Sequence, residues 1–165
     1  MDTDKPAPRH TRLEGIAEYS SAIDTVISMA RRRIRIFDRN LEGLGFNTPG
    51  RQDLLRAFLL ERQSNHVYIV VHDTGYLTRG CPRMLLLLRQ FSHGLSIHQT
   101  QAHLQGVYDP FVIADDEHFV HRFHADDSRS LLALDDPRET RNLNDRFDEL
   151  WDASYPAVFA TTIGL

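Results

Sequence analysis

The sequence predicts a single α/β domain built on one mixed β-sheet with helices on both sides. Helical patterns alternate with strand patterns over the first two thirds of the 165 residues, and strand patterns dominate after that. The strongest strand, residues 66–71 (HVYIVV), is a continuous run rich in β-branched residues, as expected where helices cover both faces. With 41% hydrophobic and 25% charged residues, a chain of this length can bury one sizeable core.

The first part of the chain is expected to alternate helices with strands. Residues 1–17 are predicted to be a flexible tail, polar at their start, that precedes a domain over residues 18–155. Ser20 or Ser21 can cap the first helix, and the arginines at 31–33 would end it, because cations suit the negative end of a helix dipole. The elements expected next are a strand over 34–37, a loop over 40–50, a helix over 51–63, the strand over 66–71, a helix from Pro82 to about residue 91 and a strand over 95–99.

The second part is expected to be rich in strands and to end in a helix. A polar connector over 100–107 leads into an apolar strand and an acidic turn at 115–116. Asp135 or Asp136 can cap the last helix, with Pro137 in its first turn. Further strands are expected over 118–123 and 130–134, and residues 156–165 form an apolar tail that can dock on the domain or on a partner.

Charge and composition narrow the class of protein. Residues 1–108 hold 14 Arg plus Lys against 10 Asp plus Glu, whereas residues 109–165 hold 5 against 13. Lys5, in the expected tail, is the only lysine, and Cys81 is the only cysteine, which excludes an internal disulfide. No apolar run reaches the roughly 18 residues of a membrane span, and the polar N-terminus lacks the apolar stretch of a signal peptide. A cytoplasmic location is therefore expected.

The order of these pieces resembles the phospholipase D-like superfamily over about residues 18–153. The resemblance rests on three patterns: an arginine-rich helix leading into residues 34–37 (IRIF), a strand ending in residues 71–73 (VHD), and residues 111–116 (FVIADD) followed by a strand and a helix with Phe147-x-x-x-Trp151. The chain is also similar to an uncharacterised bacterial domain family of this fold, described as of unknown function. The resemblance implies the fold. It also implies a homodimer, because relatives with a single motif pair to supply two.

The resemblance weakens at the residues that would perform the chemistry. Active relatives cleave or transfer phosphodiesters with His-x-Lys-x4-Asp, where histidine attacks phosphorus and lysine holds phosphate oxygens. The same spacing here is Asp109-x-Phe111-x4-Asp116, although a one-residue slip would exchange Asp116 for Asp115. A carboxylate at position 109 repels phosphate, and Phe111 carries no charge. The resemblance therefore implies a degenerate, non-catalytic domain with a binding or assembly role, without a cofactor.

One alternative is a phosphodiester hydrolase rebuilt from other groups. His72 and Asp73 follow the strongest strand, and strand ends of this kind face ligand crevices in α/β sheets. They could form a residual pocket with Asp109, His121 and Arg122. The simpler interpretation is that Asp73 begins a turn by accepting backbone hydrogen bonds.

A second alternative is a nucleic-acid-binding module, since arginine clusters contact phosphates. The cluster spans a helix end and a strand, so its members diverge, and no aromatic pattern for base stacking accompanies it. Salt bridges on a solvated face are the favoured interpretation, and nucleic acid is not an expected partner. Contact with a phosphate-bearing ligand or nucleic acid through Arg32, Arg33 and Arg35 remains open. The cluster comprises Arg31, Arg32, Arg33, Arg35 and Arg39.

Histidines at three-residue spacing raise the question of a metal site. His118, His121 and His124 follow one another along a predicted strand. Because side chains alternate between the faces of a strand, His118 and His121 should point in opposite directions. The spacing matches no zinc motif, and no metal site is predicted.

Overall fold

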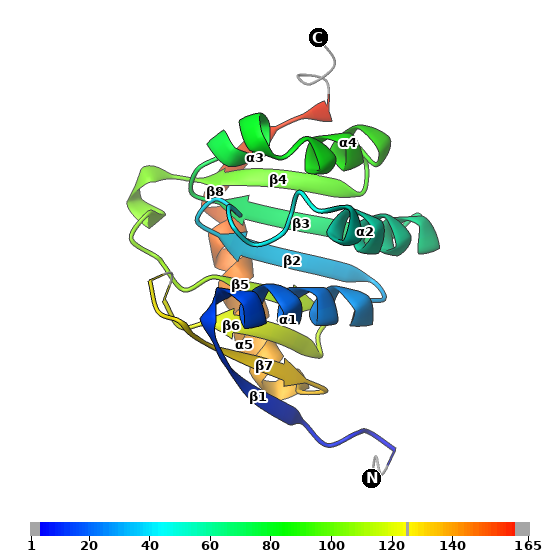
Figure 1. The fold of residues 1–165 in the computed structure, drawn as a ribbon, viewed down its shortest axis with the longest axis vertical. Helices are drawn as coiled ribbons and strands as arrows, with labels where there is room; N and C mark the ends of the chain where they lie inside the picture. Colours follow the sequence, from blue (N-terminus) through cyan, green and yellow to red (C-terminus); the bar gives the residue numbers. More distant parts are fainter. Residues whose placement is uncertain (1–3, 125, 161–165) are drawn as a thin grey trace.

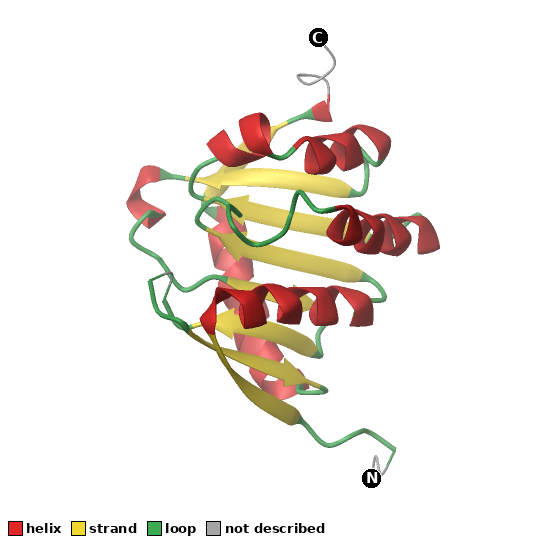
Figure 2. Ribbon diagram, viewed as in Figure 1, coloured by secondary structure: helices red, strands yellow, loops and turns green. Residues whose placement is uncertain are grey.

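The computed structural model describes residues 4–124 and 126–160, which form one eight-stranded sheet with helices against both faces (Figures 1 and 2). This is the predicted fold class. The strand order across the sheet is β1-β7-β6-β5-β2-β3-β4-β8. The strands are β1 (Arg9–Glu14), β2 (Arg33–Asp38), β3 (His66–Val71), β4 (Leu95–Thr100), β5 (Phe111–Ala114), β6 (His118–Arg122), β7 (Arg129–Leu134) and β8 (Ser154–Val158). The helices are α1 (Gly15–Met29), α2 (Pro49–Glu61), α3 (Gly75–Gly80), α4 (Pro82–Gln90) and α5 (Pro137–Asp152), with a short 3-10 turn, η1 (Ala102–Leu104).

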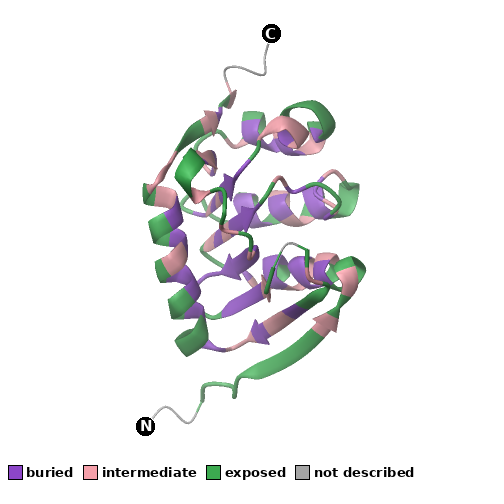
Figure 3. Cartoon of the chain, turned by 90° about the vertical axis from the view of Figure 1, so that its left-hand side faces the viewer, coloured by how far each residue is buried: buried purple, intermediate pink, exposed green. Residues whose placement is uncertain are grey.

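The sheet is mixed in direction. β2, β3 and β4 are parallel, β5, β6 and β7 form an antiparallel meander beside β2, and β1 and β8 close the two edges in antiparallel fashion. Helices α1 to α4 lie on one face and α5 lies alone on the other, as the quarter turn between Figures 1 and 3 makes clear. The C-terminal ends of the three parallel strands therefore reach the same end of the sheet, where β5 begins.

Each face of the sheet has its own core. On the side of α1, α2 and α4 the core is mainly aliphatic, with Ile23, Ile36 and Met84 among its fully buried side chains. On the side of α5 it is aromatic: Phe111 lies between Phe37 and Phe147, with ring centroids 5.6 and 6.4 Å away. Burying a side chain of this size stabilises the fold by about 2–3 kcal/mol, so Phe111 has a sufficient structural role.

The N-terminal region differs from the flexible tail expected over residues 1–17. Residues 9–14 form β1, which pairs along its whole length with β7, and α1 begins at Gly15 rather than at Ser20. Sheet pairing uses the backbone, so a strand with polar, exposed side chains gives little sequence signal. Gly15, at φ +85°, allows the sharp change of direction between β1 and α1. Residues 1–3 lie outside the described residues.

Three further differences concern element ends. Helix α1 ends at Met29, so the arginines at 31–33 form a turn and the first residue of β2 rather than a last helical turn. The six-residue α3 has no counterpart among the expected elements. Part of the expected tail over 156–165 lies in β8, which pairs with β4, whereas residues 161–165 lie outside the described residues.

The remaining elements agree with the sequence prediction to within a few residues. β3 has the predicted bounds, α4 begins at Pro82, and α5 begins at Pro137 with Asp136 as its cap. Among the residues that the structure describes, no helix is both long and apolar enough to cross a membrane.

Candidate functional site

The candidate site lies at the end of the sheet formed by the carboxyl ends of β2, β3 and β4 and the start of β5, and not at an edge strand. Ligands of open α/β sheets bind outside the carboxyl ends of the strands. A polar pocket of about 420 Å³ occupies this end. Its lining residues come from all four segments: Arg39, His72, Asp73, Gln99, Gln105 and Tyr108.

His72 is a buried support for this end of the sheet rather than a free imidazole. Its Nε2–H donates to the carbonyl of Val107 at 2.6 Å, and its Nδ1 lies 2.6 Å from the hydroxyl of the fully buried Thr100. In the neutral ring, Nδ1 accepts from that hydroxyl. Both ring nitrogens are thus occupied, and the ring ties β3 to the connector that follows β4.

The rest of the pocket carries a turn and a cation–aromatic pair. Asp73 Oδ1 accepts from the N–H of Gly75 at 2.6 Å, the contact expected of a turn-forming aspartate. The guanidinium of Arg39 lies 5.0 Å from the ring centroid of Tyr108.

Asp109 lies beside this pocket, in an ionic network on the α5 side of the sheet. Its Oδ2 accepts from Nε2 of His121 at 2.9 Å, and its Oδ1 accepts from the guanidinium of Arg146 on α5. Phe111, two residues on, is fully buried. The carboxylate is thus paired within the protein, and position 111, where the motif has the lysine that holds phosphate oxygens, is part of the hydrophobic core.

His121 and Arg122 lie on opposite faces of β6, so the structure does not bring all five residual-pocket candidates together. His121 reaches Asp109, while Arg122 extends to the α1 side, 6.0 Å from the ring of Tyr19. Burial raises the pKa of Asp38, on the same side, although the N–H groups of Leu41 and Asn40 and the charge of Arg122 oppose this shift. Burial also raises the pKa of Tyr19.

The adjacent aspartates at the far end of β5 differ sharply. Asp115 is buried in the left-handed backbone region (φ +55°), and its carboxylate accepts from three backbone N–H groups, those of Arg31, Arg32 and Arg33, at 2.8 to 3.0 Å. Asp116 is exposed and contacts the side chains of Arg33 and Asn144. The buried structural carboxylate is therefore Asp115, the residue that a one-residue slip of the motif selects.

The arginine cluster of the sequence does not form a common surface. Arg33 pairs with Asp116, and Arg35 lies under α5 against Asp148 at 3.1 Å. Arg39 lies at the opposite end of β2, in the candidate pocket. The side chains of Arg33, Arg35 and Arg39 therefore point to three different places, as expected for a cluster that spans a turn and a strand.

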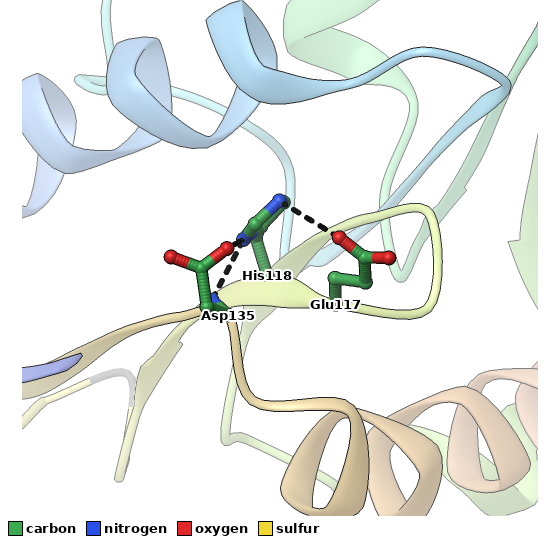
Figure 4. A group of neighbouring side chains, drawn as sticks. All are labelled: Glu117, His118 and Asp135. Carbon is green, nitrogen blue, oxygen red and sulfur yellow. Dashed lines mark hydrogen bonds and ion pairs between the residues drawn. The ribbon is translucent and has the colours of Figure 1, made fainter. Parts of the chain in front are cut away.

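Glu117, His118 and Asp135 form a compact group that could be taken for a metal site (Figure 4). His118 accepts at Nδ1 from the N–H of Asp135 at 3.0 Å, so the hydrogen of a neutral ring lies on Nε2, 3.6 Å from Glu117. A metal ion would need the Nε2 lone pair and would displace that hydrogen. The group is better explained as a histidine held between two acids, and it lies on the α1 side, away from His121.

Two residues of the site carry little sequence signal. Arg146 lies among many charged residues of α5, and only the fold places it against Asp109. Thr100 ends β4 with no motif around it. Tyr108, directly before Asp109, could have been noticed as a polar aromatic residue at the start of the motif strand.

Solved structures with the same fold identify the architectural class. Nuc from Salmonella typhimurium, described as a phospholipase D family member, has a TM-score of 0.66 at 14% identity, with 92% of this chain and 99% of that chain covered. The archaeal chromatin protein TrmBL2, whose structure shows a novel mode of DNA binding, has a TM-score of 0.66 at 12% identity, with 90% and 55% covered. Phosphatidylserine synthase from Haemophilus influenzae has a TM-score of 0.57 at 16% identity, with 100% and 43% covered.

The fold is that of the phospholipase D family, as the sequence resemblance predicted. A family profile described as "Domain of unknown function (DUF7931)" matches residues 16–159. The chain belongs to this family. No curated protein sequence matches it significantly.

Proposed function

We propose that this protein is a degenerate phospholipase D-like domain that does not cleave phosphodiesters by the histidine mechanism and acts by binding or assembly. One observation carries the proposal: at the motif strand, Asp109 is held by His121 and Arg146 while Phe111 is buried in the core. Neither the histidine nucleophile of the motif nor a cation for the phosphate oxygens remains at these positions.

The environment of the other histidines supports the same conclusion. A rebuilt hydrolase would need an imidazole free to attack or to move a proton. His72 has both nitrogens occupied, and its neighbours Thr100 and Val107 fix its orientation. His121 is the better remaining candidate: its Nε2 is bound to Asp109, and the assay below tests it by substitution.

A phosphodiesterase assay tests the proposal. Purified protein should give no turnover above buffer with bis(p-nitrophenyl) phosphate, phosphatidylcholine vesicles or single-stranded DNA. A rate that Asp109→Ala or His121→Ala abolished, and that Asp53→Ala, an exposed aspartate on α2, left unchanged, would overturn it. Thermal unfolding of each variant separates loss of activity from loss of fold.

Assembly into a homodimer is part of the proposal and rests on the resemblance to single-motif relatives. Light scattering after size exclusion should give twice the chain mass, and a monomer at all concentrations would exclude it. A cytoplasmic location remains a prediction from composition. The DNA binding of TrmBL2 belongs to that protein; here the divergence of Arg33, Arg35 and Arg39 argues against one shared nucleic-acid surface.

A further inference from the structure

A second, larger pocket lies at the opposite end of the strands from the candidate site, where the motif strand ends just before Asp115. It has a volume of about 960 Å³ and lies where α1 and α2 end and β2 begins, toward the right-hand side of Figure 1. Residues far apart in the sequence meet there, including Arg31 and Arg32 after α1, Arg62 after α2, and His118 at the start of β6.

The turn that carries Arg31 and Arg32 is fixed by hydrogen bonds from its backbone to Asp115. The Asp115 carboxylate binds the backbone N–H groups of Arg31 and Arg32 at 3.0 and 2.8 Å, as well as that of Arg33. This contact uses only the backbone of the turn and leaves the guanidinium groups of Arg31 and Arg32 available. A fixed backbone lowers the entropic cost of placing them around a ligand.

Four side chains of the pocket carry N–H donors that have no hydrogen-bond partner among the described residues. Over the described residues, the side chains of Arg31, Arg32 and Arg62 form no hydrogen bond or ion pair. The fourth donor is His118, which is 4% exposed and carries its neutral-ring hydrogen on Nε2, because Nδ1 accepts from Asp135 N–H. Nε2 has only Glu117 nearby, at 3.6 Å, which is beyond hydrogen-bond distance.

The carboxylates of the pocket are partly occupied already. Asp115 keeps its negative charge but directs its oxygens at three backbone N–H groups, which stabilise that charge within the protein, and Asp135 pairs with Arg9 at 3.2 Å. Glu61 and Glu117 remain against three guanidinium groups. A singly charged anion would gain little, because the carboxylates offset much of the arginine charge. A ligand with two adjacent oxyanion groups could engage the two arginines that follow α1 and Arg62 after α2 at the same time.

We propose that this pocket binds a small polyanion through a pyrophosphate group, using Arg31, Arg32, Arg62 and Nε2 of His118. The volume lies within the range of ligand sites in proteins. Nucleoside diphosphates and inorganic pyrophosphate share the required chemistry. The proposal does not depend on the absence of phosphodiesterase activity, because the motif strand begins at the other end of the sheet.

Calorimetric titration of the full chain with inorganic pyrophosphate at low ionic strength tests the proposal. The double variant Arg32→Gln/Arg62→Gln removes one arginine from the turn after α1 and one from the end of α2. It keeps the contact between the backbone N–H of residue 32 and the Asp115 carboxylate. It should weaken binding by about tenfold or more, since each removed guanidinium takes away a charge-assisted pair. Arg89→Gln, an exposed arginine outside the pocket, should leave binding unchanged.

The outcomes separate cleanly. Absence of pyrophosphate binding by the unaltered protein, or an equal loss in Arg89→Gln and the double variant, would overturn the proposal. Orthophosphate that bound as tightly as pyrophosphate would also contradict it, because the two-group requirement would fail. Tighter binding of ADP than of pyrophosphate would support a nucleotide as the source of the group, whereas equal binding would support recognition of the pyrophosphate group alone.

Discussion

At the residue scale, the adjacent Asp115 and Asp116 have different roles despite their identical chemistry. Asp115 is buried and accepts three backbone N–H groups. In Asp115→Asn, one oxygen is replaced by an amide NH₂ that faces donors, so at least one of the three N–H groups loses its acceptor. We expect a loss of about 2–4 kcal/mol in the free energy of unfolding, measured by urea denaturation.

Asp116→Asn is the matched control. Its carboxylate is exposed and pairs with a partly exposed Arg33, and such pairs contribute at most about 1 kcal/mol. Equal losses in the two variants would contradict the structural role assigned to Asp115.

The sequence could indicate an aspartate at this turn but could not select which one. Periodicity of the strand allows either register, because both aspartates follow the apolar run. The choice depends on Arg31, Arg32 and Arg33, more than eighty residues earlier, whose backbone N–H groups converge on one carboxylate. Every non-proline residue has a backbone N–H, so the residue types do not show which of these groups converge on a carboxylate.

At the element scale, the cap of α5 makes stability depend on pH. Asp136 Oδ1 accepts from the N–H of Glu139 at 3.0 Å, and Oδ2 lies 2.6 Å from Nε2 of His10 on β1. Burial acts to raise the pKa of Asp136, but the contacts with Glu139 and His10 outweigh it and lower the pKa. The stabilisation is therefore present above the ordinary carboxyl pKa of about 3.9 and is lost as pH falls through the lowered pKa.

Thermal unfolding across pH 7 to 3 checks this cap. Asp136→Ala should cost about 1–2 kcal/mol at neutral pH, because Glu139 loses its acceptor. Asp136→Asn retains a capping oxygen and should be nearer to the unaltered protein at pH 7, with a shallower fall in Tm below pH 4. Parallel profiles for the unaltered protein and Asp136→Asn would contradict the assignment.

The connector between β4 and β5 depends on the contact between His72 and Thr100. Thr100→Val preserves shape but leaves Nδ1 of His72 without its donor, at a cost of about 1–3 kcal/mol. Hydrogen exchange should accelerate at the amides of Leu104 and Val107, which close the turns of the connector. Thr78→Val, whose hydroxyl bonds only within its own helix, should change stability by less than about 0.5 kcal/mol.

Elements were predictable where the residue pattern itself decides the structure. β3 has a β-branched run, and α4 and α5 each begin with proline in the first turn, which the sequence shows directly. α3 was missed because six residues bounded by glycines give no helical periodicity. β1 was missed because its contribution is a row of backbone hydrogen bonds with exposed side chains.

At the scale of the whole molecule, the sheet has two edge strands that are protected in different ways. β8 contains Pro156, and its pairing with β4 has a register irregularity between Ile97 and His98; both features hinder further pairing. β1 is rich in charged residues, which discourage pairing with another chain. β7 beside it ends in four consecutive apolar residues, 131–134, and β1 pairs with it along its outer edge.

Removing residues 1–14 should therefore do more than shorten a tail. The truncated protein would expose the backbone groups of β7 together with partly buried residues such as Leu132, which packs against the larger core. We expect a lower Tm and more concentration-dependent association than in the unaltered protein, followed by thermal unfolding and light scattering. Removing residues 1–7 leaves β1 intact and should change neither quantity. A truncation at residue 14 that remained monodisperse with an unchanged Tm would show that β1 does not protect the edge, and would restore the flexible-tail interpretation.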